Sequence, residues 1–236
     1  RPRPRLRPRS SPRCVRCECL RLLLRAGSDV DAPNDVSETA LHASSSNGQP
    51  ACVSLLIAYS ASVGAMTSTG HAPLFSASSA GSRECVRLLL AASADVDGAS
   101  HDGSSALYAA CEHGRADCVE LLLKMHARTD LRTAAGYTAL MIAGANGHPA
   151  CMHLLLSAGA DMRVQGANGE TILTLVKGLS AGHHQCIRML EAEAAAALLL
   201  MEEEVCPSSL PRPSRPHPRP RPPRPSPRPP RTSPRP

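Results

Sequence analysis

The chain has 236 residues, of which 26 are Lys or Arg and 20 are Asp or Glu, and its formal net charge is +6. With no Trp, one Phe and three Tyr, an aromatic core is excluded, so Leu, Ala, Val, Ile, Met and Cys must form the core. No apolar run approaches the roughly 18 residues of a membrane-spanning helix, which excludes such a segment.

The charge is divided between two kinds of sequence. Residues 1–13 and 211–236 hold 14 of the 26 basic residues and no acidic residue, which leaves 12 basic against 20 acidic residues between them, a net charge of −8. Prolines are concentrated in the same terminal segments. Because Arg-Pro sequence lacks the apolar residues that offset the entropy of ordering, we expect 1–13 and 207–236 to be disordered tails, biased to polyproline II.

Between the tails, three residue types recur every 33 residues. A period of this length marks a supersecondary unit that cannot bury its apolar face alone, so successive units must stack side by side into a solenoid. The recurring residues are the leucines Leu41, Leu74, Leu107, Leu140 and Leu173, the cysteines Cys19, Cys52, Cys85, Cys118 and Cys151, and the glycines Gly48, Gly81, Gly114 and Gly147.

The first unit, about 14–33, is expected to be a half unit. Glu18–Asp29 has the pattern of a second helix and its exit turn, but the sequence upstream, where a first helix should lie, is Arg-Pro. Proline is costly inside a helix. We therefore expect a truncated unit or a degenerate cap at this end.

Four full units follow, at about 34–66, 67–99, 100–132 and 133–165. In the third, His101-Asp102-Gly103 is typical of a tight turn. A short helix is expected from about Ser105 to Glu112, ending at Gly114. A second helix with a broad apolar face begins at Asp117. Each unit is thus predicted as turn, helix, turn, helix.

The last unit, about 166–205, is two residues longer, since Cys151 and Cys186 are 35 apart. Its second helix continues through strong helix formers to the acidic run ending at Glu204. We interpret this helix as a polar C-terminal cap of one repeat domain spanning 14–206.

The units resemble ankyrin repeats. Gly70, Gly103, Gly136 and Gly169 match the glycine of that family's hairpin tip, Thr39-Ala40-Leu41-His42 matches its Thr-Pro-Leu-His step, and Ala158-Gly159-Ala160-Asp161 matches its exit. The resemblance covers roughly 18–205 and implies an all-α ankyrin-repeat solenoid of stacked helix-turn-helix units with short hairpin loops.

One departure concerns the Thr-Pro-Leu-His step, whose Thr and His hydrogen-bond within the repeat in this family. The His place is filled by His42 once and then by Phe75, Tyr108, Met141 and Thr174. Each lost hydrogen bond costs on the order of 0.5–1.5 kcal/mol. We therefore expect an array that is less stable than a consensus array and whose terminal repeats are its least stable part.

The sequence offers little for catalysis or for a cofactor. The ten histidines show no arrangement of nucleophile, base and pocket, and no glycine-rich phosphate loop is present. Cys14, Cys17 and Cys19 form a C-x2-C-x-C motif, but zinc needs four ligands and no second pair stands nearby. We expect no enzyme, no cofactor and no metal, and we assign the periodic cysteines to the core.

By resemblance, the chain is a non-catalytic scaffold or adaptor that binds an unidentified partner protein through its hairpin tips and the concave groove of its first helices. Tyr137 is either an exposed interface anchor or packed against the neighbouring hairpin. The candidate partner-binding residues are Asp35, Glu38, Ser68, His71, His101, Asp102, Glu112, His113, Ala134, Tyr137, Asn146, Asn168 and Glu170.

The alternative function lies in the tails. Their arginines would attract nucleic acid or an anionic surface without sequence specificity, leaving the repeats as a spacer. Arg219–Pro225 also fits a ligand of polyproline-binding domains, and the tails could equally have no role. A third possibility is regulation of an enzyme domain N-terminal to the chain. We expect a monomer in a reducing compartment, the cytoplasm or the nucleus.

Overall fold

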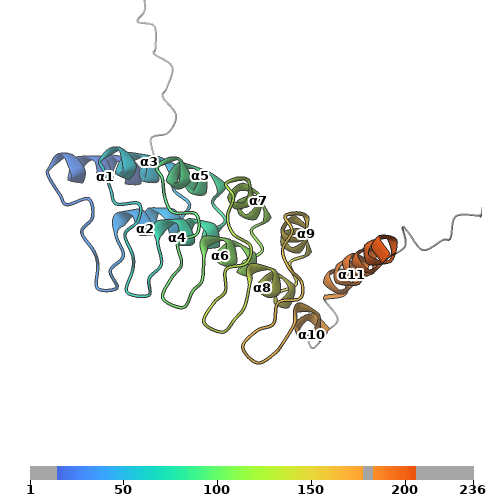
Figure 1. The fold of residues 1–236 in the computed structure, drawn as a ribbon. Helices are drawn as coiled ribbons and strands as arrows, with labels where there is room; N and C mark the ends of the chain where they lie inside the picture. The colour runs from blue at the N-terminus through green and yellow to red at the C-terminus, as the bar shows by residue number, and fades with distance from the viewer. Residues whose placement is uncertain (1–14, 178–182, 206–236) are drawn as a thin grey trace, which may run out of the picture. The chain divides into compact units, whose positions relative to one another are not determined.

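The computed structural model describes residues 15–177 and 183–205, and both expected tails lie outside the described residues. The described part is built from α-helices and contains no strand beyond two isolated bridges, which confirms the all-α class (Figure 1). The helices are α1 (Val15–Arg25), α2 (Ala40–Ser46), α3 (Pro50–Ala58), α4 (Pro73–Ala80), α5 (Arg83–Ala91), α6 (Ala106–Glu112), α7 (Ala116–Lys124), α8 (Ala139–Ala145), α9 (Pro149–Ser157), α10 (Ile172–Lys177) and α11 (His184–Val205).

The helices up to α10 form two layers. The first helices of the repeats, α2, α4, α6, α8 and α10, pack in order against one another, and α1, α3, α5, α7 and α9 pack in order in the second layer. A row of hairpin loops projects beyond the first helices (Figure 1). Because α1 packs against α3, it is a second helix, as the half unit predicts.

Local sequence sets the ends of the short helices. The hydroxyl of Ser105 accepts the backbone N–H of Tyr108 at 3.2 Å at the start of α6, and Thr138 does the same for Met141 at 3.4 Å at the start of α8. Pro73 opens α4, where its missing N–H costs nothing. Gly81 ends the same helix in the left-handed conformation, with φ 78°.

The core follows the 33-residue registers except at the array's two ends. Leucines 41, 74, 107 and 140 are at most 1% exposed, whereas Leu173 on α10 is 36% exposed. The expectation that all five periodic cysteines are core residues is wrong for Cys19, which is exposed on α1. Within the described residues no repeat precedes α1 and no first helix follows α10, so these side chains lack the neighbour that covers the others.

Backbone hydrogen bonds join successive hairpins. Within each hairpin, the first residue donates its N–H to the carbonyl of the fifth, as Ser100 does to Ser104 at 3.0 Å. Between hairpins the bonds repeat with the 33-residue period: from Ser68 to Val36 (3.0 Å), His101 to Thr69 (3.2 Å), Ala134 to Asp102 (2.7 Å) and Ala167 to Ala135 (3.0 Å). The five hairpins therefore form one continuous, hydrogen-bonded row.

Helix α11 begins as the second helix of the last unit. Cys186 and Leu190 are buried in the hydrophobic core, so its first turns pack as expected of a second helix. Residues 196–205 continue the helix and belong to a separate unit. The expected two-residue insertion falls in or beside 178–182, outside the described residues. No helix in the described ranges is long and apolar enough to cross a membrane.

Candidate partner-binding surface

Three adjoining hollows run along the hairpins and the first helices. We call this strip the hairpin face. We number them in the order of the repeats. The first and second hollows share Asp102 as a lining residue, and the second and third share Tyr137. Their volumes are about 420, 250 and 190 Å³. The first is lined by Ser68, Thr69, His71, His101 and Asp102, the second by Asp102, Tyr108, Thr133, Ala134, Ala135 and Tyr137, and the third by Tyr137, Met141, Ile142, Ala145 and Leu175.

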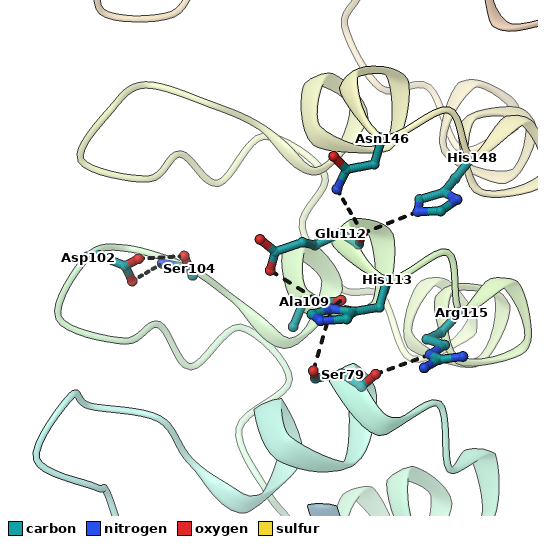
Figure 2. A network of polar contacts seen from close by, with 9 residues as sticks. All are labelled: Ser79, Asp102, Ser104, Ala109, Glu112, His113, Arg115, Asn146 and His148. Carbon is teal, nitrogen blue, oxygen red and sulfur yellow. Dashed lines mark hydrogen bonds and ion pairs between the residues drawn. The ribbon is translucent and has the colours of Figure 1, made fainter. Parts of the chain in front are cut away.

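Asp102 stands between the first two hollows. Its Oδ1 accepts the Ser100 hydroxyl and the backbone N–H of Ser104, and its Oδ2 accepts the Ser104 hydroxyl at 3.0 Å. Figure 2 shows the bonds to Ser104 on the hairpin. The hydrogen bond from the Ser100 hydroxyl is the main cause of the lowered pKa of Asp102, so the carboxylate stays charged. The three hydrogen bonds together fix its orientation.

Tyr137 separates the second and third hollows and is half-buried. Its hydroxyl donates to Oε1 of Glu170 on the next hairpin at 3.4 Å, and Asn168 donates to the same oxygen at 3.0 Å. Of the two expected placements of this ring, the structure has the one packed against the neighbouring hairpin. The Asn168 amide lowers the pKa of Glu170, which holds that carboxylate in its charged form.

The Thr-Pro-Leu-His step of the first full repeat keeps its hydrogen bonds. His42 is buried, its Nδ1 accepts the backbone N–H of Thr39 at 3.2 Å, and its Nε2–H donates to the carbonyl of His71 at 3.0 Å. Burial lowers the pKa of His42 and keeps the ring neutral. The bond to His71 ties the first helix of one repeat to the next hairpin.

The repeats that lack this histidine use other contacts. Phe75 stacks on His71 with ring centroids 4.0 Å apart and planes 5° apart. Ser105 and Thr138 cap their helices, as described above. In the last repeat the hydroxyl of Thr171 accepts the backbone N–H of Thr174 at 3.3 Å. Phe75 thus makes a ring contact of its own, whereas in the other repeats the Ser or Thr at the start of the helix still accepts the backbone N–H three residues later.

The ends of the first helices are joined from repeat to repeat (Figure 2). The carbonyl of Glu112 accepts Nδ2 of Asn146 at 2.8 Å and Nε2 of His148 at 3.2 Å. The imidazole of His113 donates from Nδ1 to the carbonyl of Ala109 at 3.0 Å. Glu112 and Asn146 thus take part in the contacts that join α6 and α8, whereas His113 bonds to its own helix and, at 3.5 Å, to the hydroxyl of Ser79 on α4.

The same contact recurs along the array. Arg115 donates from Nε to the carbonyl of Ser79 at 3.1 Å, and His183 donates from Nε2 to that of Ala145 at 3.1 Å. Each donor also covers the turn glycine of the preceding repeat. A Cβ on Gly114 would meet the His148 ring at 2.6 Å. Gly81, Gly114 and Gly147 thus allow the covering side chain to approach closely, in addition to taking a positive φ.

The structure brings many, but not all, of the expected binding residues together. The hollows include Ser68, His71, His101, Asp102, Ala134 and Tyr137, and Asn168 and Glu170 join them through Tyr137. Asp35 and Glu38 lie on the first hairpin, outside the three hollows. There, Glu38 donates its backbone N–H to Oδ1 of Asn34 at 2.8 Å.

Sequence reasoning did not single out some of the residues that line the hollows. Tyr108, Thr133, Met141, Ile142 and Leu175 line the second and third hollows. Tyr108 and Met141 occupy the His place of the Thr-Pro-Leu-His step, which predicts a bond within the repeat instead of a surface contact. The sequence does contain a signal for these two residues, because each lies one position after the core leucine of its repeat.

The described residues contain no group of three or more His, Cys, Asp or Glu side chains that could hold a metal ion. Cys14, the first cysteine of the C-x2-C-x-C motif, lies outside the described residues, so the complete motif is not seen. Of the other two, Cys17 is half-buried and Cys19 exposed.

The paired helices, the hairpin row and the Thr39–His42 bond are what the resemblance predicts. A family model described as ankyrin repeats (3 copies) matches residues 13–99 and 93–166, more than half of the chain. The chain belongs to the ankyrin repeat family. None of the curated proteins searched matches it. The contacts described above show how this ankyrin array keeps its repeats in register despite its departures from the family pattern.

Proposed function

We propose that the chain is a protein-interaction module, a scaffold or adaptor that binds a partner protein on the hairpin face. Ankyrin repeats are generally protein-interaction modules and are typically non-catalytic. The observation that carries the proposal is the continuity of the three hollows across successive hairpins that are joined by hydrogen bonds. A surface that is ordered before binding loses little conformational entropy when the partner docks.

The distribution of ion pairs supports this choice of face. The second helices carry exposed pairs, including Arg87 with Glu84 at 2.6 Å and Arg83 with Glu120 at 3.1 Å. In the described part of the chain, neither Asp102 nor Glu170 pairs with a Lys or Arg. These carboxylates of the second helices are already paired with arginines, whereas the exposed Asp102 carboxylate on the hairpin face has no such partner and is available to a binding protein.

The remaining parts of the proposal rest on the sequence. The repeat domain spans 14–206, the chain acts as a monomer, and the site of action is the cytoplasm or nucleus. The periodic cysteines support the cytoplasm or nucleus as the site of action, because these compartments keep thiols reduced. Stacked helices lie about 10 Å apart, which exceeds the Cα separation that a disulfide between successive periodic cysteines allows. In this proposal the repeats, and not the basic tails, select the partner.

Affinity capture followed by mass spectrometry tests the proposal. The full chain is compared with the double variant Asp102→Ala/Tyr137→Ala and with the matched variant Glu84→Ala/Arg87→Ala, which removes an exposed ion pair from α5. We expect the first variant to lose specific partners that both the wild type and the second variant retain. Recovery of the same proteins by all three chains would reject the hairpin face.

A further inference from the structure

The second hollow of the hairpin face combines one carboxylate with two aromatic rings. Asp102, Tyr108 and Tyr137 line it together with the small residues of the hairpin 133–137. These three side chains come from two hairpins and from helix α6, so the stacking of repeats alone brings them together. At about 250 Å³, the hollow has room for one long side chain and is too small for a helix or a strand.

The carboxylate of Asp102 is held by neutral donors. Its Oδ1 accepts two hydrogen bonds and its Oδ2 accepts one, which leaves Oδ2 with a further acceptor position. No Lys or Arg in the described residues forms an ion pair with it. A carboxylate that is fixed in direction but lacks a cation is complementary to a positively charged ligand group.

The two tyrosines favour a planar cation. Tyrosine faces attract cations at separations of about 6 Å or less, and guanidinium stacks on such faces more readily than the strongly hydrated ammonium group. Burial raises the pKa of Tyr108 to about 12, so its ring remains a neutral phenol. The carboxylates of Glu112 and Asp102 both act electrostatically on Tyr108, which adds to the negative potential at this ring.

We propose that the Asp102–Tyr108–Tyr137 hollow binds an arginine side chain from an extended segment of the partner protein. This inference rests on the proposed function and identifies the chemistry of the partner. One guanidinium N–H donates to Oδ2 of Asp102, and the guanidinium plane stacks on a tyrosine ring. The neighbouring hollows receive residues before and after the arginine, because they adjoin this one at Asp102 and Tyr137. A nucleic-acid phosphate would be repelled by the same carboxylates.

The test is an NMR titration of the isotope-labelled full chain with the capped peptide Gly-Ser-Arg-Ser-Gly. We expect saturable shifts of the Ser104 and Ala134 amides, whose N–H groups bond to Asp102. Replacing arginine by the neutral isostere citrulline should weaken binding about tenfold, the scale of one charge-assisted contact. Lysine in the same place should bind more weakly than arginine, since it stacks less well.

Two variants that each remove one negative charge locate the site. Asp102→Asn should weaken binding of the arginine peptide about tenfold, whereas Asp117→Asn, on α7, should leave it unchanged. Equal binding of the arginine and citrulline peptides, or equal weakening by both variants, would overturn the inference. If the arginine peptide fails to bind but partner capture still depends on the hairpin face, the proposed function stands and this inference alone fails.

Discussion

At the scale of single residues, the array retains side chains where the backbone favours glycine. Ser60, Ser93 and His126 have φ between 61° and 65° after the second helices, and the equivalent positions in the first and fifth exit turns are Gly27 and Gly159. Left-handed backbone costs a residue with a Cβ roughly 1–2 kcal/mol. The 33-residue register predicts these three sites from sequence, because it aligns them with the two glycines.

Ser93→Gly should therefore stabilise the protein. We expect the free energy of unfolding to rise by about 0.5–1 kcal/mol. This is the backbone strain that glycine removes, minus the larger conformational entropy that glycine loses on folding. Chemical denaturation of the full chain measures the change. The control is Ser76→Gly inside α4, which should destabilise by about 0.5 kcal/mol, the difference between the helix propensities of serine and glycine. A loss of stability in Ser93→Gly would contradict the strain at this turn.

His42 predicts a dependence of stability on pH. Burial lowers its pKa in the folded state below the ordinary value of 6.5, so the unfolded chain binds the proton more readily. The stabilising contribution of neutral His42 is complete above pH 6.5 and decreases as the pH falls from there toward the lowered folded-state pKa.

Denaturation of the wild type and of His42→Gln between pH 7.5 and pH 5 checks this dependence. We expect the two unfolding free energies to converge toward the acidic end of that range, because only the wild type loses the contribution of a neutral imidazole. A constant difference between the two proteins across this range would rule out the assigned role of His42.

At the scale of the elements, the sequence predicts where helices end but not what covers their ends. The glycine series correctly marks the turns after the first helices, since positive φ is a local property. The side chain lying over each glycine comes from the next repeat: Arg115 over Gly81 and His148 over Gly114. Nothing local to Gly114 indicates that an imidazole 34 residues later also binds the carbonyl of Glu112.

Removing one of these inter-repeat contacts should loosen the array. We expect His148→Ala to lower the free energy of unfolding by about 0.5–1.5 kcal/mol, because the bond from Nε2 to the carbonyl of Glu112 is lost. The matched control is His153→Ala on the same helix α9, where the side chain is exposed and little change is expected. Equal effects of the two substitutions would show that the Glu112 contact does not stabilise the stack.

At the scale of the whole molecule, the period was enough to predict the repeats, their two helices and the row of hairpins. It failed at both ends of the array, where Cys19 and Leu173 keep core residue types without a covering neighbour. It also could not place the ring of Tyr137, whose contact with Glu170 depends on the spacing between two hairpins. Periodicity identifies equivalent positions, whereas the surface depends on how those positions differ.

Hydrogen exchange of the full chain, free and bound to a captured partner, tests the central claim most directly. The account predicts slower exchange in the complex at the hairpins 67–71, 100–104 and 133–137, with little change in the exposed turns after α5 and α7. Protection confined to the second helices, with the three hairpins exchanging as in the free chain, would contradict binding on the hairpin face.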